Sequence, residues 1–116
     1  MTYEAWRDRF MEAADEHLYP AEWLDKRVES GRAQFWCNDA GAILAEIRQY
    51  PSGVKEVHGL VAAGDLEAIR ALIPQAEQWG RTKGCTRASI SSHPAWARLL
   101  RDDGYLPHQL TIAKEM

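Results

Sequence analysis

The second half of the chain, from Gly53 to Met116, alternates strand-like with helix-like segments, and this order limits the fold more than any other feature. The apolar run Val54–Val61 predicts a strand. It passes through Ala62–Gly64 directly into a helix that begins near Asp65 and carries one apolar stripe. Such a junction often binds a small molecule or a phosphate, because the first N–H groups of a helix lack intrahelical partners.

A second strand, helix and strand follow this long helix. Arg87–Ser91 predicts a strand, Pro94–Asp103 predicts a short helix, and the chain after Gly104 and Tyr105 predicts a closing strand. Pro74 lies inside the long helix pattern, where a proline removes one backbone hydrogen bond. We therefore expect a kink or break in that helix.

Two helices are expected at the start of the chain. Thr2 suits the N-cap of the first, whose apolar stripe reaches His17 and which should stop before Pro20. The second spans Ala21–Glu29 and ends at the Ser-Gly pair that follows it.

Three strands joined by short turns come next. Apolar and polar residues alternate from Arg32 to Cys37, and Asn38–Gly41 is a turn signal. Ala42–Tyr50 is the second strand, and the turn Pro51–Gly53 leads to the third, Val54–Val61. This spacing predicts an antiparallel meander.

The chain length of 116 residues predicts one domain, residues 1–116. Its parts are two N-terminal helices in 1–30, the meander in 32–61, and a helix-strand-helix-strand half in 65–116. This order defines an α+β fold with a central mixed sheet and helices on both of its faces.

Composition and charge exclude several classes of protein. An apolar fraction of 46% favours a folded globular domain, and a net charge of −3 argues against a general nucleic-acid binder. No apolar run is long enough for a bilayer, and the acidic residues among the first 20 argue against a signal peptide. We therefore expect a cytoplasmic protein. Cys37 and Cys85 are too few for a disulfide framework and are interpreted as small core residues.

No metal site is expected, because the four histidines are scattered and no His-x-x-x-His or Glu-x-x-His pair occurs.

The segment His93–Tyr105 is similar to the short penultimate helix of the GCN5-related N-acetyltransferases (GNAT family), which ends in a Gly-aromatic pair. Together with the order of elements, it makes the chain resemble a GNAT domain, the fold of acyl-CoA N-acyltransferases, that lacks its first strand. The resemblance implies that acetyl-CoA would lie between two parallel strands, here Val54–Val61 and Arg87–Ser91. It further implies that backbone N–H groups at the start of the long helix would hold the pyrophosphate.

The matching pyrophosphate loop in this chain departs from the family pattern. The residues at that place are Val61, Ala62, Ala63, Gly64, Asp65 and Leu66. Only one glycine remains, the basic residue is absent, and the loop is shorter. We expect the Asp65 carboxylate to cap the helix, which makes an ordinary strand–helix turn the alternative to a phosphate cradle.

The resemblance also locates the acid and base of the reaction. The tyrosine that protonates the leaving thiolate in many family members is Leu100 here. Glu56 and His58 are two apart on the third strand and share a face, so either could deprotonate an amine. The alternative is an ordinary polar sheet face.

Because the glycine loop, the tyrosine and a secure base are missing or incomplete, we expect a GNAT-fold protein that acts as a non-catalytic binding or structural component. Its shortness resembles phage- or prophage-encoded proteins, which adds virion association to the expected locations. No cofactor is then expected, and a protein partner or self-association as a homodimer is favoured over nucleic acid or membrane. The alternative is an active small N-acetyltransferase that uses acetyl-CoA. A DNA-binding regulator is disfavoured by the acidic balance.

Overall fold

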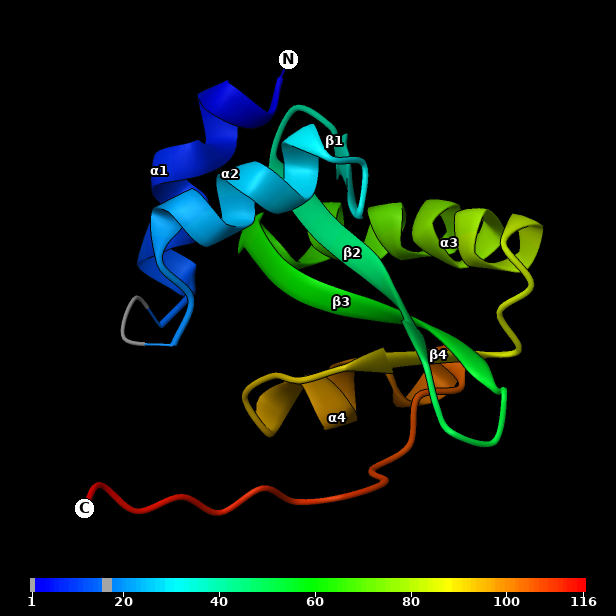
Figure 1. Cartoon of the computed structure of the whole chain (residues 1–116). Coiled ribbons are helices and arrows are strands. Elements are labelled where there is room, and N and C mark those ends of the chain that lie inside the picture. Colours follow the sequence, from blue (N-terminus) through cyan, green and yellow to red (C-terminus); the bar gives the residue numbers. More distant parts are fainter. Residues whose placement is uncertain (1, 16–17) are drawn as a thin grey trace.

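A four-stranded mixed sheet forms the centre of the computed structural model, which describes residues 2–15 and 18–116 (Figure 1). The strands lie in the order β1-β2-β3-β4, and the first three form the predicted antiparallel meander. Their bounds are Ala33–Cys37 for β1, Gly41–Gln49 for β2 and Lys55–Gly64 for β3. The fourth strand, β4 (Arg87–Ile90), pairs in parallel with β3, an arrangement that needs a crossover connection such as the helix between them.

The helices cover both faces of this sheet (Figure 1). Helices α1 (Tyr3–Ala13) and α2 (Ala21–Glu29) pack on one face, and α3 (Leu66–Thr82) packs on the other. A short α4 (Ala95–Leu99) and a 3₁₀ turn, η1 (Arg101–Asp103), follow β4. The α+β class and the element order up to this turn are therefore confirmed.

Two hydrophobic clusters hold these layers together. On the α1 side, Trp6 and Phe10 of α1 pack against Leu44 of β2. On the α3 side, Ile69 and Leu72 pack against strand residues that include Val57. Burial of a side chain of this size contributes roughly 1.5–3 kcal/mol, so both helices are fixed to the sheet mainly by apolar contact.

Local helix signals are only partly confirmed. Helix α2 has the predicted bounds, and Thr2 stands at the N-cap position of α1 but makes no side-chain capping hydrogen bond. His17 lies outside the described residues. Helix α3 continues without a break past Pro74, so of the expected kink or break, the break does not occur. Its apolar stripe packs on β2 and β3, and this contact offsets the one hydrogen bond that a proline removes.

The expected closing strand does not form. Residues 106–116 contain no helix or strand and are exposed, and in Figure 1 this segment runs away from the sheet. Leu106, Leu110 and Ile112 are 69%, 81% and 85% exposed. The apolar spacing of these residues suggested a strand. A strand also needs a neighbouring strand to pair with, and this segment pairs with none of the described strands.

Candidate functional site

The candidate site begins where β3 and β4 part. The parallel ladder ends at the pair Gly59–Ile90, although β3 continues to Gly64. On its other side, β3 shifts register against β2 at Leu44/Ala45, which leaves Leu60 as an extra residue. Such a β-bulge bends a strand and increases its twist. The bulge therefore turns the end of β3 away from β4 and opens a cleft between two strands that begin as neighbours.

A cavity of about 420 Å³ occupies this cleft. Its volume lies within the range of small-molecule sites, roughly 300–1,000 Å³. Residues from both layers and from β2, β3 and β4 line it, including Asp15, Tyr19, Ile43, Leu60, Val61, Ala62, Ile69, Ile73, Glu77, Ser89, Ile90, Trp96 and Tyr105.

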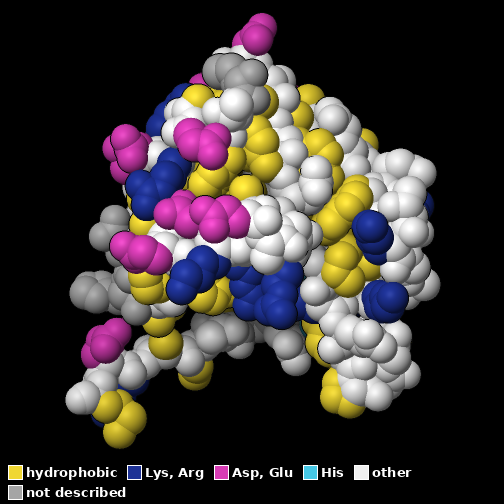
Figure 2. Space-filling model, turned by 45° about the horizontal axis from the view of Figure 1, so that its top comes forward, with side chains coloured by type: hydrophobic (Ala, Val, Ile, Leu, Met, Phe, Trp, Pro, Cys, Tyr) yellow, Lys and Arg dark blue, Asp and Glu magenta, His cyan; other side chains and the backbone are white. Residues whose placement is uncertain are grey.

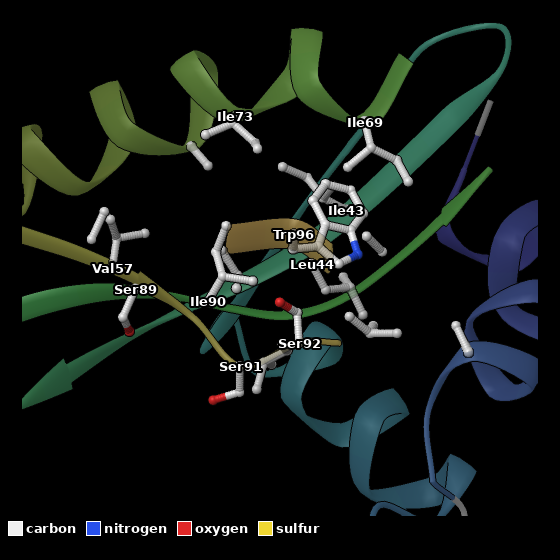
Figure 3. Close-up of a pocket in the computed structure, with 18 of the residues that line it drawn as sticks. Ile43, Leu44, Val57, Ile69, Ile73, Ser89, Ile90, Ser91, Ser92 and Trp96 are labelled. Carbon is white, nitrogen blue, oxygen red and sulfur yellow. The ribbon is translucent and has the colours of Figure 1, made fainter. Parts of the chain in front are cut away.

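Most of the cavity wall is apolar, with hydroxyl groups along one side (Figure 3). Ile73 approaches from α3, and Trp96 of α4 lies beside Ile43 and Leu44. Ser91 and Ser92 continue the chain beyond β4 along the rim. An elongated ligand with an apolar body and a few polar groups matches this lining.

The residues predicted to bind a cofactor divide at the end of β3. Val61 and Ala62 line the cavity. Ala63 is buried in the α1-side cluster, while Gly64, Asp65 and Leu66 are exposed and lie outside the cavity lining.

Gly64 has a packing role that the sequence did not reveal. Its φ is +107°, a region that favours glycine, and a Cβ there would lie 2.2 Å from the carbonyl oxygen of Ala40. The next N–H, that of Asp65, donates to the same oxygen at 2.9 Å. This glycine therefore lets the end of β3 press against the turn that precedes β2.

The start of α3 differs from the expectation for Asp65. This residue stands at the N-cap position, but its carboxylate makes no capping hydrogen bond, which corrects our prediction. Only Asp65 separates β3 from α3, so no glycine-rich loop exists here. With Glu67 in the first turn, two carboxylates lie near the helix end that would face a pyrophosphate, and their charge opposes it.

The two base candidates lie together on the sheet face opposite α3, and neither lines the cavity, although their neighbour Ser89 does. Glu56 is 1% exposed, accepts from Tyr50 Oη at 3.0 Å and Arg87 Nε at 2.5 Å, and lies close to the hydroxyl of Ser89. Burial alone would raise the pKa of this carboxyl, but the hydrogen bonds from Ser89, Arg87 and Tyr50 outweigh it and lower the pKa. Glu56 is thus an ionised, fully engaged carboxylate rather than a free base.

His58 is the other buried group, at 4% exposure. Its Nδ1 lies 2.8 Å from Ser89 Oγ, and Ser89 also lines the cavity. Burial lowers the pKa of His58, and the nearby Arg48 lowers it further, so the ring is neutral at neutral pH. A neutral imidazole can accept a proton, which makes His58 the better base of the two.

Polar residues of the neighbouring strands complete this face. Glu46 of β2 lies directly opposite His58 and is 7% exposed. Its two carboxylate oxygens accept from Arg27 of α2 at 3.0 Å and from Arg48 of β2 at 3.3 Å. Glu46, Arg48 and the β4 residues were not predicted as site residues, although their alternation along each strand is visible in the sequence. Only the cross-strand register brings them together.

The position that matches the thiolate acid is occupied by a core residue. Leu100 is buried at 2% exposure and has no acidic proton. Tyr105 does line the cavity, and its hydroxyl donates to Glu77 at 2.7 Å. Burial and this hydrogen bond raise the pKa of Tyr105, which makes it a poor proton donor.

Other classes of site find no support in the described residues. No group of three or more His, Cys, Asp or Glu side chains is arranged to hold a metal ion, and no helix is long and apolar enough to cross a membrane. Figure 2 shows Lys and Arg side chains beside Asp and Glu side chains on the face in view, rather than one continuous basic surface.

Solved acetyltransferases share this architecture. A putative acetyl transferase from Pyrococcus furiosus superposes with a TM-score of 0.67 at 20% identity, covering 100% of this chain and 80% of that one. The aminoglycoside N-acetyltransferase AAC(6')-Iy, solved in complex with CoA, gives 0.71 at 17% identity, covering 97% and 87%. Glucosamine-6-phosphate N-acetyltransferase from Arabidopsis thaliana gives 0.71 at 10% identity, covering 96% and 88%.

These likenesses establish the fold. The chain has the GNAT acetyltransferase fold, an α+β architecture with a mixed sheet flanked by helices, as the sequence resemblance predicted. No protein-family model matches the chain, and no curated protein matches it in sequence.

Proposed function

We propose that this chain is an N-acyltransferase that holds the acyl-pantetheine arm of a CoA thioester in the cleft between β3 and β4. The observation that carries the proposal is the parting of these strands around the 420 Å³ cavity. Beyond Gly59, the β4-facing edge of Leu60–Ala62 has no partner among the described strands. That edge can bond an extended ligand in the manner of an added strand. The AAC(6')-Iy complex with CoA, which has the same fold, supports this ligand class.

The cofactor would supply an acyl carbonyl activated as a thioester. His58 lies one ladder step from the point where the strands part, and its role is to accept the proton that the amine loses when the new C–N bond forms. The C–S bond of the thioester would break in the same reaction, and the departing thiolate would take its proton from water. Ser89 is placed between His58 and Glu56, so its hydroxyl can donate to the carboxylate while it accepts from Nδ1–H. That arrangement keeps the lone pair on Nε2, the nitrogen that would face the amine.

Ligand binding is the first test, because it distinguishes binding of the pantetheine arm in the cavity from binding of the nucleotide at the start of α3. S-acetylpantetheine, which lacks the nucleotide, and acetyl-CoA should both raise the melting temperature, whereas ADP should not. At about 100 times its dissociation constant a ligand stabilises by about 2.7 kcal/mol, on the order of 10 °C for a domain of this size. Absence of a shift with both thioesters would reject the proposal.

The second candidate is the non-catalytic protein expected from the sequence, a binding or structural component. It is favoured by the buried Leu100 at the acid position and by the two carboxylates at the start of α3. A phage or prophage origin, a cytoplasmic or virion-associated location and a homodimer or other protein partner belong to this candidate. Thioester binding without acyl transfer to any amine would support it.

The charge at the start of α3 can be tested separately. Asp65→Asn keeps the shape of the side chain and removes its charge, so acetyl-CoA should bind about three- to tenfold more tightly, while S-acetylpantetheine is unaffected. Glu4→Gln, which removes a first-turn carboxylate from α1, is the control. Equal binding of acetyl-CoA before and after Asp65→Asn would show that loop length, not charge, limits the affinity.

A further inference from the structure

The polar side chains below the cleft form two rows across three strands. Cross-strand register places Arg48, Glu56 and Arg87 in one row, on β2, β3 and β4. The second row is Glu46, His58 and Ser89, one step closer to the point where the strands part. Residues directly opposite in a ladder share a face, so all six project to the side away from α3.

The two arginines at the ends of the first row are only partly engaged. Within the described part of the chain, Arg48 donates through Nε to Glu46 and Arg87 donates through Nε to Glu56. Their side chains are 42% and 38% exposed. The terminal nitrogens of both guanidinium groups are therefore open to a ligand, and such a pair of nitrogens suits the two oxygens of a carboxylate.

The charges of this face leave a surplus of one. Arg27, Arg48 and Arg87 contribute three positive charges, and Glu46 and Glu56 contribute two negative charges. His58 adds none when it is neutral. A monoanion balances this face, whereas a dianionic phosphate would leave it negative.

The distance between the rows matches a small bifunctional molecule. Side chains two residues apart on one face of a strand are separated by about 6.5–7 Å. A molecule that presents its amine to the row of His58 and Ser89 reaches the row of Arg48 and Arg87 with a group only a few atoms away. Neutral or purely cationic amines would leave both guanidinium groups without a partner.

We propose that the acceptor is an amine that also carries a carboxylate, such as an amino acid, and that Arg48 and Arg87 bind this carboxylate. The inference rests on the proposed N-acyltransferase function, since it names the acceptor class of the same site. The two arginines orient the acceptor so that its amine faces His58.

Matched acceptors test this inference directly. Acetyl transfer from acetyl-CoA is measured for phenylalanine against phenethylamine, tyrosine against tyramine, and lysine against cadaverine, which differ only by the carboxylate. The amino acid of each pair should have the higher kcat/KM by about 10- to 100-fold, the range for hydrogen bonds to a charged group. Equal or greater use of the decarboxylated amines would overturn the inference.

Two variants test whether Arg48 and Arg87 cause the preference for an acceptor with a carboxylate. Arg48→Met removes one guanidinium, and Glu46 keeps its bond to Arg27. Arg87→Lys keeps the positive charge beside the buried Glu56 but loses the fork of donors. Each should reduce the preference for the amino acid, mainly through KM. Arg70→Met, which breaks the exposed pair with Asp103 elsewhere on the protein, is the control and should leave the preference unchanged.

A binding readout distinguishes failure of this inference from failure of the proposed function. The side-chain Nε–Hε resonances of Arg48 and Arg87 are followed by NMR while phenylalanine or phenethylamine is added without any thioester. Shifts with phenylalanine alone would support the carboxylate site even if no acyl transfer occurs. No shift with phenylalanine would overturn it, even if acyl transfer to other amines is detected.

Discussion

The close approach of Gly64 to Ala40 allows a quantitative test of how the end of β3 is packed. In Gly64→Ala the new Cβ would lie 2.2 Å from the Ala40 carbonyl oxygen and 2.7 Å from Cα of Gly41. Both neighbours are backbone atoms, so the contact can be relieved only by moving the turn before β2 or the end of β3. Gly53→Ala is the matched control, because its φ is +93° and a Cβ there meets no atom within 4 Å.

Both substitutions carry the conformational cost of a positive φ, and only Gly64→Ala adds a steric cost. A left-handed conformation costs a residue with a Cβ about 1–2 kcal/mol, and this applies at both positions. The steric contact at Gly64 adds roughly 1–3 kcal/mol, the cost of forcing extra atoms into a packed site. At about 4 °C per kcal/mol for this chain length, Gly53→Ala should lower Tm by about 4–8 °C and Gly64→Ala by about 8–20 °C.

Thermal unfolding followed by circular dichroism measures both shifts under one condition. Equal losses in the two variants would refute the steric argument. Binding of S-acetylpantetheine to the folded Gly64→Ala protein should remain, because Gly64 lies outside the cavity lining. A variant that keeps its Tm but loses this binding would instead assign Gly64 to the ligand.

Three further outcomes follow from the site and the C-terminal segment. His58→Ala should lower the rate of acetyl transfer by about 10²–10⁴-fold, whereas His108→Ala, in the exposed segment, should not; equal rates in both would remove His58 as the base. Because the pKa of His58 is lowered on folding, the unfolded chain binds more protons below pH 6.5, so Tm should fall as pH drops from about 6.5. His58→Asn should flatten that decline, and an unchanged slope would assign it to other groups. Removal of residues 106–116 should leave Tm unchanged, since they are exposed and outside every described helix and strand; a clear loss would mean that they pair with the sheet in solution.

Local signals predicted most of the fold. The bounds of α2 follow from Pro20 and the Ser-Gly pair, and the turns at Asn38–Gly41 and Pro51–Gly53 separate the meander strands close to their observed ends. The closing strand was wrong because apolar alternation does not supply the neighbouring edge that a strand requires. Asp65 was wrong as a side-chain cap because residue type favours a capping bond without fixing the side-chain geometry.

Of the candidate site, the sequence predicted only the residues that lie together on a single strand. Glu56 and His58 were found together because residues two apart share a face. Arg48 and Arg87 could not be joined to them, because this needs the exact register of the hairpin that pairs Arg48 with Glu56 and of the parallel ladder that pairs Glu56 with Arg87. The cavity itself was implied by the family resemblance, but its cause, the extra residue in β3, has no local sequence signal.

The extra residue at Leu60 also changes the phase of β3. Before Leu60, the residues that face the α1 side have even numbers, such as Glu56 and His58. After Leu60, the residues that face this side have odd numbers, Val61 and Ala63. The strand thus behaves as two short strands joined by a one-residue spacer, a polar one and an apolar one. Deletion of Leu60 would place Val61 directly after Gly59 in regular alternation, so the side chains of both halves would keep their faces, but the bulge that bends the strand would be lost. Such a deletion should therefore leave β3 paired with β2 while it closes the cleft between β3 and β4.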